Sequence, residues 1–257
     1  ANAHGACVQC KETYLQGAVI HVERAGQIMH ALAEAGYQAY IVGGAVRDIV
    51  RGVMPKDIDL ATNARPEQVI QLARTRGWQT VAVGAAFGVV LVCVDGQSYE
   101  VATFRGERYG VDSHRPEEVW YCDSIEEDLS RRDFTMNAMA LDSSRQLIDR
   151  FDGAEDIRNK VIRAVGRPEV QFAEDGLRMF RAARFAAQLN FTIEPQTMQA
   201  IPPNLERVQG LSVERVRSEI EKTLLSDYPA NGLDIMLKIG LLNQSCRSKN
   251  GQQIQSV

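Results

Sequence analysis

Two aspartates one residue apart, Asp57 and Asp59, form a pair whose spacing indicates metal chemistry. Side chains two positions apart on a strand project from the same face, so a strand here would direct both carboxylates to one spot. Two adjacent carboxylates repel each other unless a cation lies between them, and Mg²⁺ prefers oxygen ligands. We therefore predict that Asp57 and Asp59 are catalytic residues that hold Mg²⁺. Solvated charges at a strand edge are the alternative for any isolated pair of this kind.

A third carboxylate, Glu100, lies in a predicted strand over 98–104 that could pair near the two aspartates. Strand carboxylates that face one side of a sheet are usually solvated. Beside a metal-binding pair, however, Glu100 is a candidate third catalytic carboxylate.

Two glycines precede the aspartates, in the segment Gly43-Gly44-Ala-Val-Arg47-Asp. This segment follows a predicted strand over 39–42 and opens a predicted helix. Glycines let a backbone approach a phosphate closely, and a helix N-terminus offers unpaired N–H groups. Arg47 adds a fork of donors suited to a triphosphate. We predict nucleotide binding by Gly43, Gly44 and Arg47, with a tight strand–helix turn without ligand as the alternative.

Further along the chain, Arg131-Arg132-Asp133 follows an acidic helix start. Arg132 is suited to hold a phosphate or ribose, and Asp133 to accept a hydrogen bond from a ribose hydroxyl. The alternative is a buried Arg–Asp pair with a purely structural role.

Three arginines, Arg178, Arg181 and Arg184, step by three residues along a predicted helix and form one stripe. A solvated helix face is the usual explanation of such spacing. Only one acidic pair, which includes Asp175, precedes these arginines, so they would repel one another without an anionic partner. A nucleoside triphosphate or a tRNA backbone would be such a partner.

The surrounding pattern predicts an α/β region followed by a helical one. Helices are expected over 19–35, 66–76, 171–189, 194–201, 213–225 and 230–239, and strands over 39–42, 57–60, 78–83, 88–94 and 98–104. Asp95-Gly96 predicts a hairpin turn, and 105–123 a long loop. We predict a disordered N-terminal extension over 1–17, a head domain over 18–150, a helical neck over 151–242 and a frayed tail over 243–257.

Composition places the chain among ordinary globular proteins, with 45% hydrophobic and 24% charged residues. There is no apolar run long enough to span a membrane, and the five cysteines argue against a disulfide framework, which favours the cytoplasm. The net charge of −4 is not the basic excess typical of nucleic-acid-binding proteins, but a local arginine stripe can serve instead. Cys7 and Cys10 form only half of a zinc site.

Five segments taken together resemble the motifs of bacterial class II tRNA nucleotidyltransferases and poly(A) polymerases. They are residues 43–48, 57–59, 131–133, 174–178 and 212–222, and they occur in that order. The resemblance implies an α+β fold, with a polymerase-β-like head built on a mixed or antiparallel sheet and an all-helical neck. It also implies Mg²⁺ at the two aspartates, and a triphosphate held near Gly44 and Arg47. It places the nucleotide contacts on Arg132, Asp175, Arg178, Arg181 and Arg184.

The activity implied by this resemblance is template-independent addition of C, C and A to the 3′ end of tRNA, from CTP and ATP, with release of pyrophosphate. The segment 105–116 resembles a flexible loop of CCA-adding members. Family members usually continue beyond the neck, whereas this chain stops shortly after residue 242. Poly(A) tailing, partial addition of CC or A alone, and nonenzymatic nucleotide or RNA binding remain the alternatives.

Overall fold

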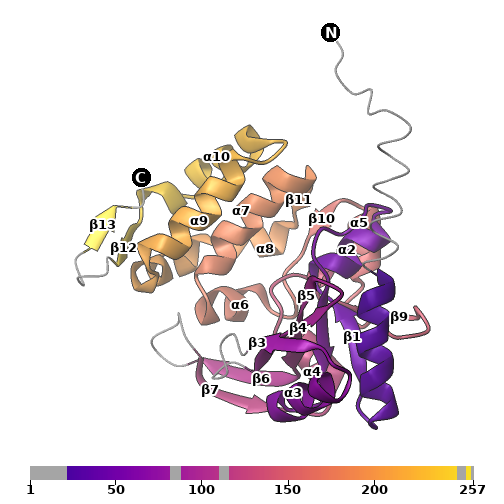
Figure 1. Cartoon of the computed structure of the whole chain (residues 1–257). Coiled ribbons are helices and arrows are strands. Elements are labelled where there is room, and N and C mark those ends of the chain that lie inside the picture. The colour runs from indigo at the N-terminus through magenta and orange to yellow at the C-terminus, as the bar shows by residue number, and fades with distance from the viewer. Residues whose placement is uncertain (1–21, 82–87, 110–115, 248–252, 256–257) are drawn as a thin grey trace. The chain divides into compact units, whose positions relative to one another are not determined.

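The computed structural model describes residues 22–81, 88–109, 116–247 and 253–255 (Figure 1). The chain divides into two compact units. The first consists of Ala1–Arg105, Tyr121–Leu129 and Met139–Arg150, and the second of Gly106–Trp120, Ser130–Ala138 and Phe151–Val257. The predicted extension over 1–17 lies outside the described residues, and the domain boundaries expected from the sequence stay predictions.

The first unit is built on a seven-stranded sheet with the order β3-β4-β5-β2-β1-β8-β9. The strands are β1 (Ala39–Val42), β2 (Asp59–Thr62), β3 (Gln79–Val81), β4 (Val89–Val94), β5 (Gln97–Thr103), β8 (Met139–Leu141) and β9 (Leu147–Asp149). β2 runs parallel to β5, and every other neighbouring pair is antiparallel. The mixed sheet expected for the head is therefore confirmed.

Local sequence explains how these strands are connected and buried. Asp95 and Gly96 both have positive φ, 48° and 77°, which suits the two-residue turn joining β4 to β5 and confirms the predicted hairpin. In β4 every second residue is buried, as expected of a strand with one face in the core. The helices are the segment 22–34, α2 (Gly44–Val50), α3 (Pro66–Thr75) and α4 (Ile125–Ser130, whose last residue falls in the second unit).

The prediction of a long loop over 105–123 is wrong for the described residues of that segment. Instead, β6 (Arg105–Tyr109) pairs with β7 (Pro116–Tyr121). Glycine at 106 indicated a loop, yet a Cβ there would lie 2.4 Å from the Trp120 ring. The absence of a side chain at Gly106 therefore leaves room for the cross-strand ring of Trp120, and the glycine does not end the strand.

The second unit is mainly helical. Its helices are α5 (Gly153–Arg158), α6 (Pro168–Glu174), α7 (Leu177–Leu189), α8 (Pro195–Gln199), α9 (Val213–Leu224) and α10 (Pro229–Lys238), with 3₁₀ segments η2 (Thr135–Asn137), η3 (Pro202–Gly210) and η4 (Leu241–Asn243). Two short strand pairs accompany them, so the neck expected to be all-helical is mainly, and not entirely, helical. β10 (Val161–Ile162) is parallel to β11 (Thr192–Ile193), and β12 (Ser245–Arg247) is antiparallel to β13 (Gln253–Gln255).

Two expectations for this unit need correction. The single helix predicted over 171–189 is α6 and α7, because Asp175 has the extended backbone angles φ −140° and ψ 106°. The tail predicted to fray after residue 243 contains the β12–β13 pair, and Cys246 on β12 is 1% exposed.

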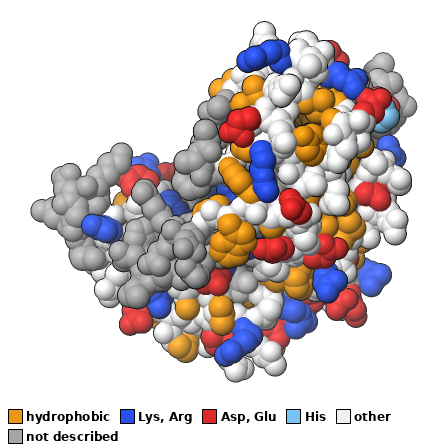
Figure 2. Space-filling view, turned by 90° about the horizontal axis from the view of Figure 1, so that it is seen from below, with side chains coloured by type: hydrophobic (Ala, Val, Ile, Leu, Met, Phe, Trp, Pro, Cys, Tyr) orange, Lys and Arg blue, Asp and Glu red, His pale blue; other side chains and the backbone are white. Residues whose placement is uncertain are grey.

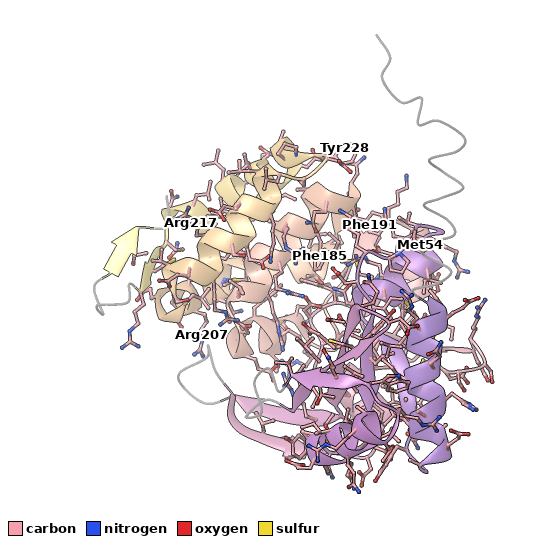
Figure 3. All side chains as sticks on the ribbon, viewed as in Figure 1. Met54, Phe185, Phe191, Arg207, Arg217 and Tyr228 are labelled. Carbon is pink, nitrogen blue, oxygen red and sulfur yellow. The ribbon has the colours of Figure 1, made fainter. Side chains whose placement is uncertain are left out.

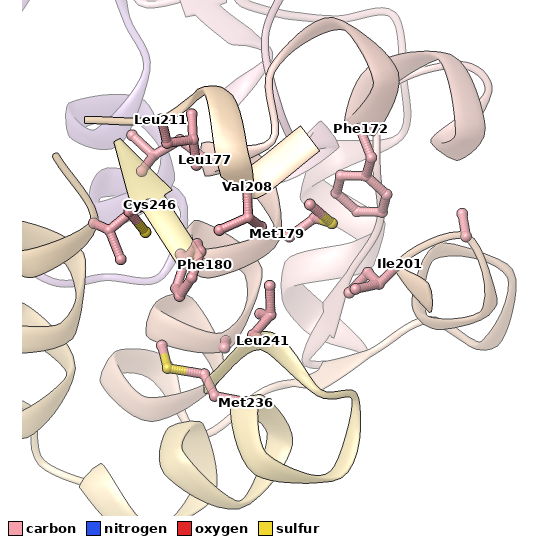
Figure 4. Close-up of a cluster of buried hydrophobic side chains, with 13 residues drawn as sticks. Phe172, Leu177, Met179, Phe180, Ile201, Val208, Leu211, Met236, Leu241 and Cys246 are labelled. Carbon is pink, nitrogen blue, oxygen red and sulfur yellow. The ribbon is translucent and has the colours of Figure 1, made fainter. Parts of the chain in front are cut away.

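The core of the second unit surrounds α7, with Met179 and Phe180 packed among side chains from the neighbouring segments (Figure 4). α9 and α10 both pack on α7. Gly232 on α10 permits this close packing, because a Cβ there would lie 2.6 Å from Thr223 and 2.8 Å from Ala187. The helix that carries the arginine stripe is thus the centre of the unit's core.

Candidate active site

The two aspartates lie at the start of β2. Asp59 is the first residue of the strand, whereas Asp57 occupies a bend two residues earlier, so the predicted strand begins later than expected. Ile58 between them is 4% exposed, while both aspartates are exposed. This alternation places the two carboxylates on the side opposite the buried isoleucine, as the D-x-D spacing predicts.

Glu100 lies beside this pair. β5 runs parallel to β2 with Glu100 directly opposite Asp59, and both residues are exposed. In the described part of the chain, no group of three His, Cys, Asp or Glu side chains is arranged to hold a metal ion as it stands. The oxygen-only donor set of Asp57 and Asp59 nevertheless fits a hard divalent cation.

Gly43 and Gly44 lie in the turn from β1 into α2. Gly43 has φ 70°, a conformation that glycine adopts without steric cost. Arg47 packs its guanidinium over Gly44, where an added Cβ would lie 3.6 Å from Nη2. The same guanidinium donates from Nε to Asp48, 3.0 Å away. The structure therefore brings Arg47 and the glycine turn together.

In the second unit, Asp133 is held in the core. It is 7% exposed and accepts hydrogen bonds from Arg181 Nε at 2.7 Å, Asn137 Nδ2 at 3.1 Å and the Phe134 backbone N–H at 2.8 Å. Burial alone would raise the pKa of Asp133, but the charge of Arg181 and the hydrogen bonds from Asn137 and Arg181 together lower it. Arg132, the adjacent residue, is half-buried.

Arg178 is 6% exposed and its guanidinium is anchored by several acceptors. Nη1 donates to the Glu174 carboxylate at 3.1 Å and to the side chain and backbone oxygen of Gln171. Nη2 donates to the backbone oxygen of Arg131 at 3.0 Å. These bonds fix the position of the Arg178 guanidinium at the junction of α6 and α7.

Arg184 is also buried and pairs with Glu219 on α9. Its Nη1 donates to Gln188 at 2.7 Å, and its guanidinium carbon lies 4.0 Å from the centre of the Phe185 ring. Burial lowers the pKa of Arg184, while Glu219 opposes that shift.

The repulsion argument made for the arginine stripe is therefore wrong. All three arginines pair with a carboxylate of this chain. Arg178 pairs with Glu174. Arg181 and Arg184 pair with Asp133 and Glu219, which lie 48 and 35 positions away in the sequence. The stripe does not require an external anion. The nucleotide-binding roles of these three residues stay predictions.

Asp175 occupies the break between α6 and α7. Its Oδ1 accepts from the Leu177 backbone N–H at 3.0 Å, and its Oδ2 accepts from Arg215 Nη2 at 3.1 Å. The sequence reasoning missed Arg215, although it lies within the fifth motif, residues 212–222. It also missed Gln171 and Glu219, which hold Arg178 and Arg184.

On the face shown in Figure 2, acidic and basic side chains of the described residues are interspersed and are not gathered by sign.

None of the helices in the described ranges combines the length and apolarity needed to cross a bilayer.

Two family models match the chain. The poly A polymerase head domain matches residues 39–163, and the probable RNA- and SrmB-binding site of polymerase A matches residues 190–246. Together they cover the D-x-D pair, the glycine turn, α8, α9 and α10. The chain therefore belongs to the poly(A) polymerase family of nucleotidyltransferases, which confirms the resemblance seen in its motifs. Membership implies the use of a divalent metal ion.

Within this family the chain is similar to CCA-adding enzymes. It is 43% identical to that of Levilactobacillus brevis over 219 residues, which are 85% of this chain and 54% of the relative. It is 45% identical to that of Lactiplantibacillus plantarum, covering 85% of this chain and 53% of the relative. The chain spans about half the length of the curated relatives that it matches.

Solved structures give the same result. The CCA-adding enzyme of Bacillus stearothermophilus in complex with CTP matches with a TM-score of 0.78 and 43% identity, over 85% of this chain and 52% of that one. A tRNA nucleotidyltransferase complexed with a primer tRNA and an incoming ATP analog matches with a TM-score of 0.69 and 33% identity, over 85% of this chain and 61% of that one. These matches confirm the predicted fold class.

Proposed function

We propose that this chain carries out CCA addition: the transfer of C, C and A from CTP and ATP to the 3′ end of tRNA. The observation that carries the proposal is the exposed Asp57–Asp59 pair at the start of β2, in a chain 43% identical to a CTP-bound CCA-adding enzyme. In each step the 3′ oxygen of the tRNA bonds to the α-phosphorus of the nucleotide, and pyrophosphate leaves.

Asp57 and Asp59 are the residues that would hold Mg²⁺ in this proposal, with Glu100 next to them. When bound, the metal lowers the pKa of the attacking hydroxyl and neutralises charge on the α-phosphate and the departing pyrophosphate. Gly43, Gly44 and Arg47 lie in the same unit and would hold the triphosphate, since a guanidinium forms two parallel bonds to phosphate oxygens. Arg132 and Asp133 would contact the sugar and phosphate, although Asp133 already accepts three hydrogen bonds from this chain.

Base choice would depend on Asp175 and Arg178. Cytosine and adenine each present an amine donor next to a ring-nitrogen acceptor, whereas uracil and guanine present the reverse order. A carboxylate and a guanidinium therefore match C and A, and each mismatched polar group would cost about 1–3 kcal/mol. Arg181 and Arg184 would support this pair as neighbours on α7.

Poly(A) synthesis is the second candidate, because the family model that matches the head is that of poly A polymerase. Both activities need the same transfer chemistry, and they differ in what stops the reaction.

The cytoplasmic location expected from the cysteines stays a prediction.

The distinguishing experiment incubates the purified chain with Mg²⁺, a tRNA lacking its 3′ CCA, and CTP and ATP separately and together. Product length is resolved to one nucleotide. Arrest after C, C and A supports the proposal, whereas a long A tail, CC alone or A alone reassigns the activity within the family. Nucleotide binding without extension would contradict an autonomous transferase and support a binding role.

A further inference from the structure

Asp175 is fixed by donors from two different helices. The Leu177 N–H, in the first turn of α7, lies 3.0 Å from Oδ1, and Arg215 Nη2, in the first turn of α9, lies 3.1 Å from Oδ2. We propose that Arg215 is a positioning residue that orients the Asp175 carboxylate for base selection. This inference rests on the proposed function and assigns a specificity-determining role to a residue outside the predicted site.

The second donor is needed because one hydrogen bond does not fix a carboxylate. With the bond to Leu177 alone, the carboxylate of Asp175 can turn about its last torsion, which has a broad energy minimum. The Arg215 bond to the other oxygen removes this freedom. An ionised carboxylate has about four acceptor positions, so the hydrogen bonds from Leu177 and Arg215 leave Asp175 able to accept from a base amine.

Arg215 is itself held in place. Ser212 caps α9, and its hydroxyl accepts from the Arg215 backbone N–H at 3.4 Å. This cap fixes the first turn of α9, from which the Arg215 side chain reaches back to the α6–α7 break. The local structure of α9 thus determines where the guanidinium lies relative to Asp175.

Exposure separates this pair from the structural pairs nearby. The side chains of Arg215 and Asp175 are 40% and 15% exposed, whereas those of Arg184 and Glu219 are 9% and 6% exposed. A pair that remains partly in water contributes little to the free energy of unfolding. Loss of Arg215 should therefore affect the orientation of Asp175 more than the stability of the fold.

The test compares Arg215→Ala and Arg215→Lys with Arg217→Ala in the full chain. Arg217, labelled in Figure 3, is the matched control, because it lies on the same helix, its side chain is 75% exposed, and it pairs with Glu221 one turn away. Binding of CTP, ATP, UTP and GTP is measured at constant Mg²⁺, and thermal unfolding is recorded for each variant. Arg215→Gln replaces Arg215→Ala if the alanine variant does not fold.

We expect Arg215→Ala to reduce the preference for CTP over UTP by about tenfold, the effect of one well-placed hydrogen bond. Arg215→Lys should recover part of this preference, and Arg217→Ala should leave it unchanged. An unchanged preference in Arg215→Ala, or an equal loss in Arg217→Ala, would overturn the inference. A wild-type chain that binds all four nucleotides equally would instead refute base reading in the proposed function.

Discussion

The Arg181 guanidinium pairs with the Asp133 carboxylate across 48 positions of sequence, with Nε 2.7 Å from Oδ2. Asp133 lies just before η2, and Arg181 lies in the middle of α7. The carboxylate also accepts from Asn137, so it serves as the junction of a polar network inside the second unit. The charge of Asp133 also keeps the pKa of Arg181 above its usual value. Asp133, which the sequence predicts to bind ribose, is thus a structural partner of Arg181 in the arginine stripe.

Replacement of Asp133 by Asn should destabilise the chain by about 1–3 kcal/mol at neutral pH, because it leaves Arg181 without its counter-charge. Urea unfolding of the two proteins measures this difference. Equal stability would show that the pair does not contribute to the fold.

The same pair predicts a pH dependence. The folded-state pKa of Asp133 lies below its usual value of 3.8, because the Arg181 charge and the hydrogen bonds outweigh burial. Its contribution to stability is therefore fully present well above pH 3.8 and is lost as pH falls from there toward the folded-state pKa. Unfolding free energies measured between pH 7 and pH 3 should fall more steeply in the wild type than in Asp133→Asn. Parallel curves would contradict the lowered pKa.

Glu219→Gln should cost about 3–5 kcal/mol, since it leaves the buried Arg184 charge without its partner. Glu221→Gln is the matched control on the same helix. The side chain of Glu221 is 51% exposed and pairs with Arg217, so its loss should cost less than about 1 kcal/mol. Urea denaturation midpoints of the two variants test this contrast, and equal midpoints would show that burial does not distinguish the pairs.

Gly232→Ala should destabilise the chain by about 1–3 kcal/mol, because the added methyl would meet Thr223, Ala187 and the backbone oxygen of Ala183 within 2.9 Å. Gly26→Ala, in the helix 22–34, meets nothing within 4 Å and should stabilise by up to about 1 kcal/mol. Thermal unfolding of both variants checks the opposite signs. A stabilising effect at 232 would mean that α10 can move away from α7 without cost.

Sequence reasoning predicted local features of the head well. The Asp95-Gly96 turn was predictable because Asp and Gly both tolerate the positive φ angles that this turn requires. That the side chains of Asp57 and Asp59 lie on the same side of the strand was predictable because side chains alternate between the two faces. That Glu100 lies directly opposite Asp59 depends on the parallel pairing of β2 and β5, which are separated by two other strands in the chain. Such a register is not readable from spacing alone.

The second unit shows what local patterns miss. The periodicity of 171–189 continues across Gly176, but a Cβ there would lie 3.1 Å from the Arg207 backbone on η3 (Figure 3). Close packing of a distant segment thus accounts for the glycine at the break. The carboxylates that neutralise Arg181 and Arg184 also come from segments far away in sequence, so the stripe looked unpaired when only its neighbours along the chain were considered.

The decisive measurement is the incorporation of a single C from CTP into a tRNA that lacks its 3′ CCA. The rates of Asp57→Asn and Asp59→Asn are compared with that of the wild type. Asp234→Asn is the control, because its exposed carboxylate pairs with Lys238 on the same helix, α10. Each D-x-D variant should lose about a thousandfold in rate or more while its unfolding curve is unchanged, because the proposed metal ligands act on the transferred phosphate. A D-x-D variant that transfers C as fast as Asp234→Asn would contradict metal-assisted nucleotidyl transfer at this site.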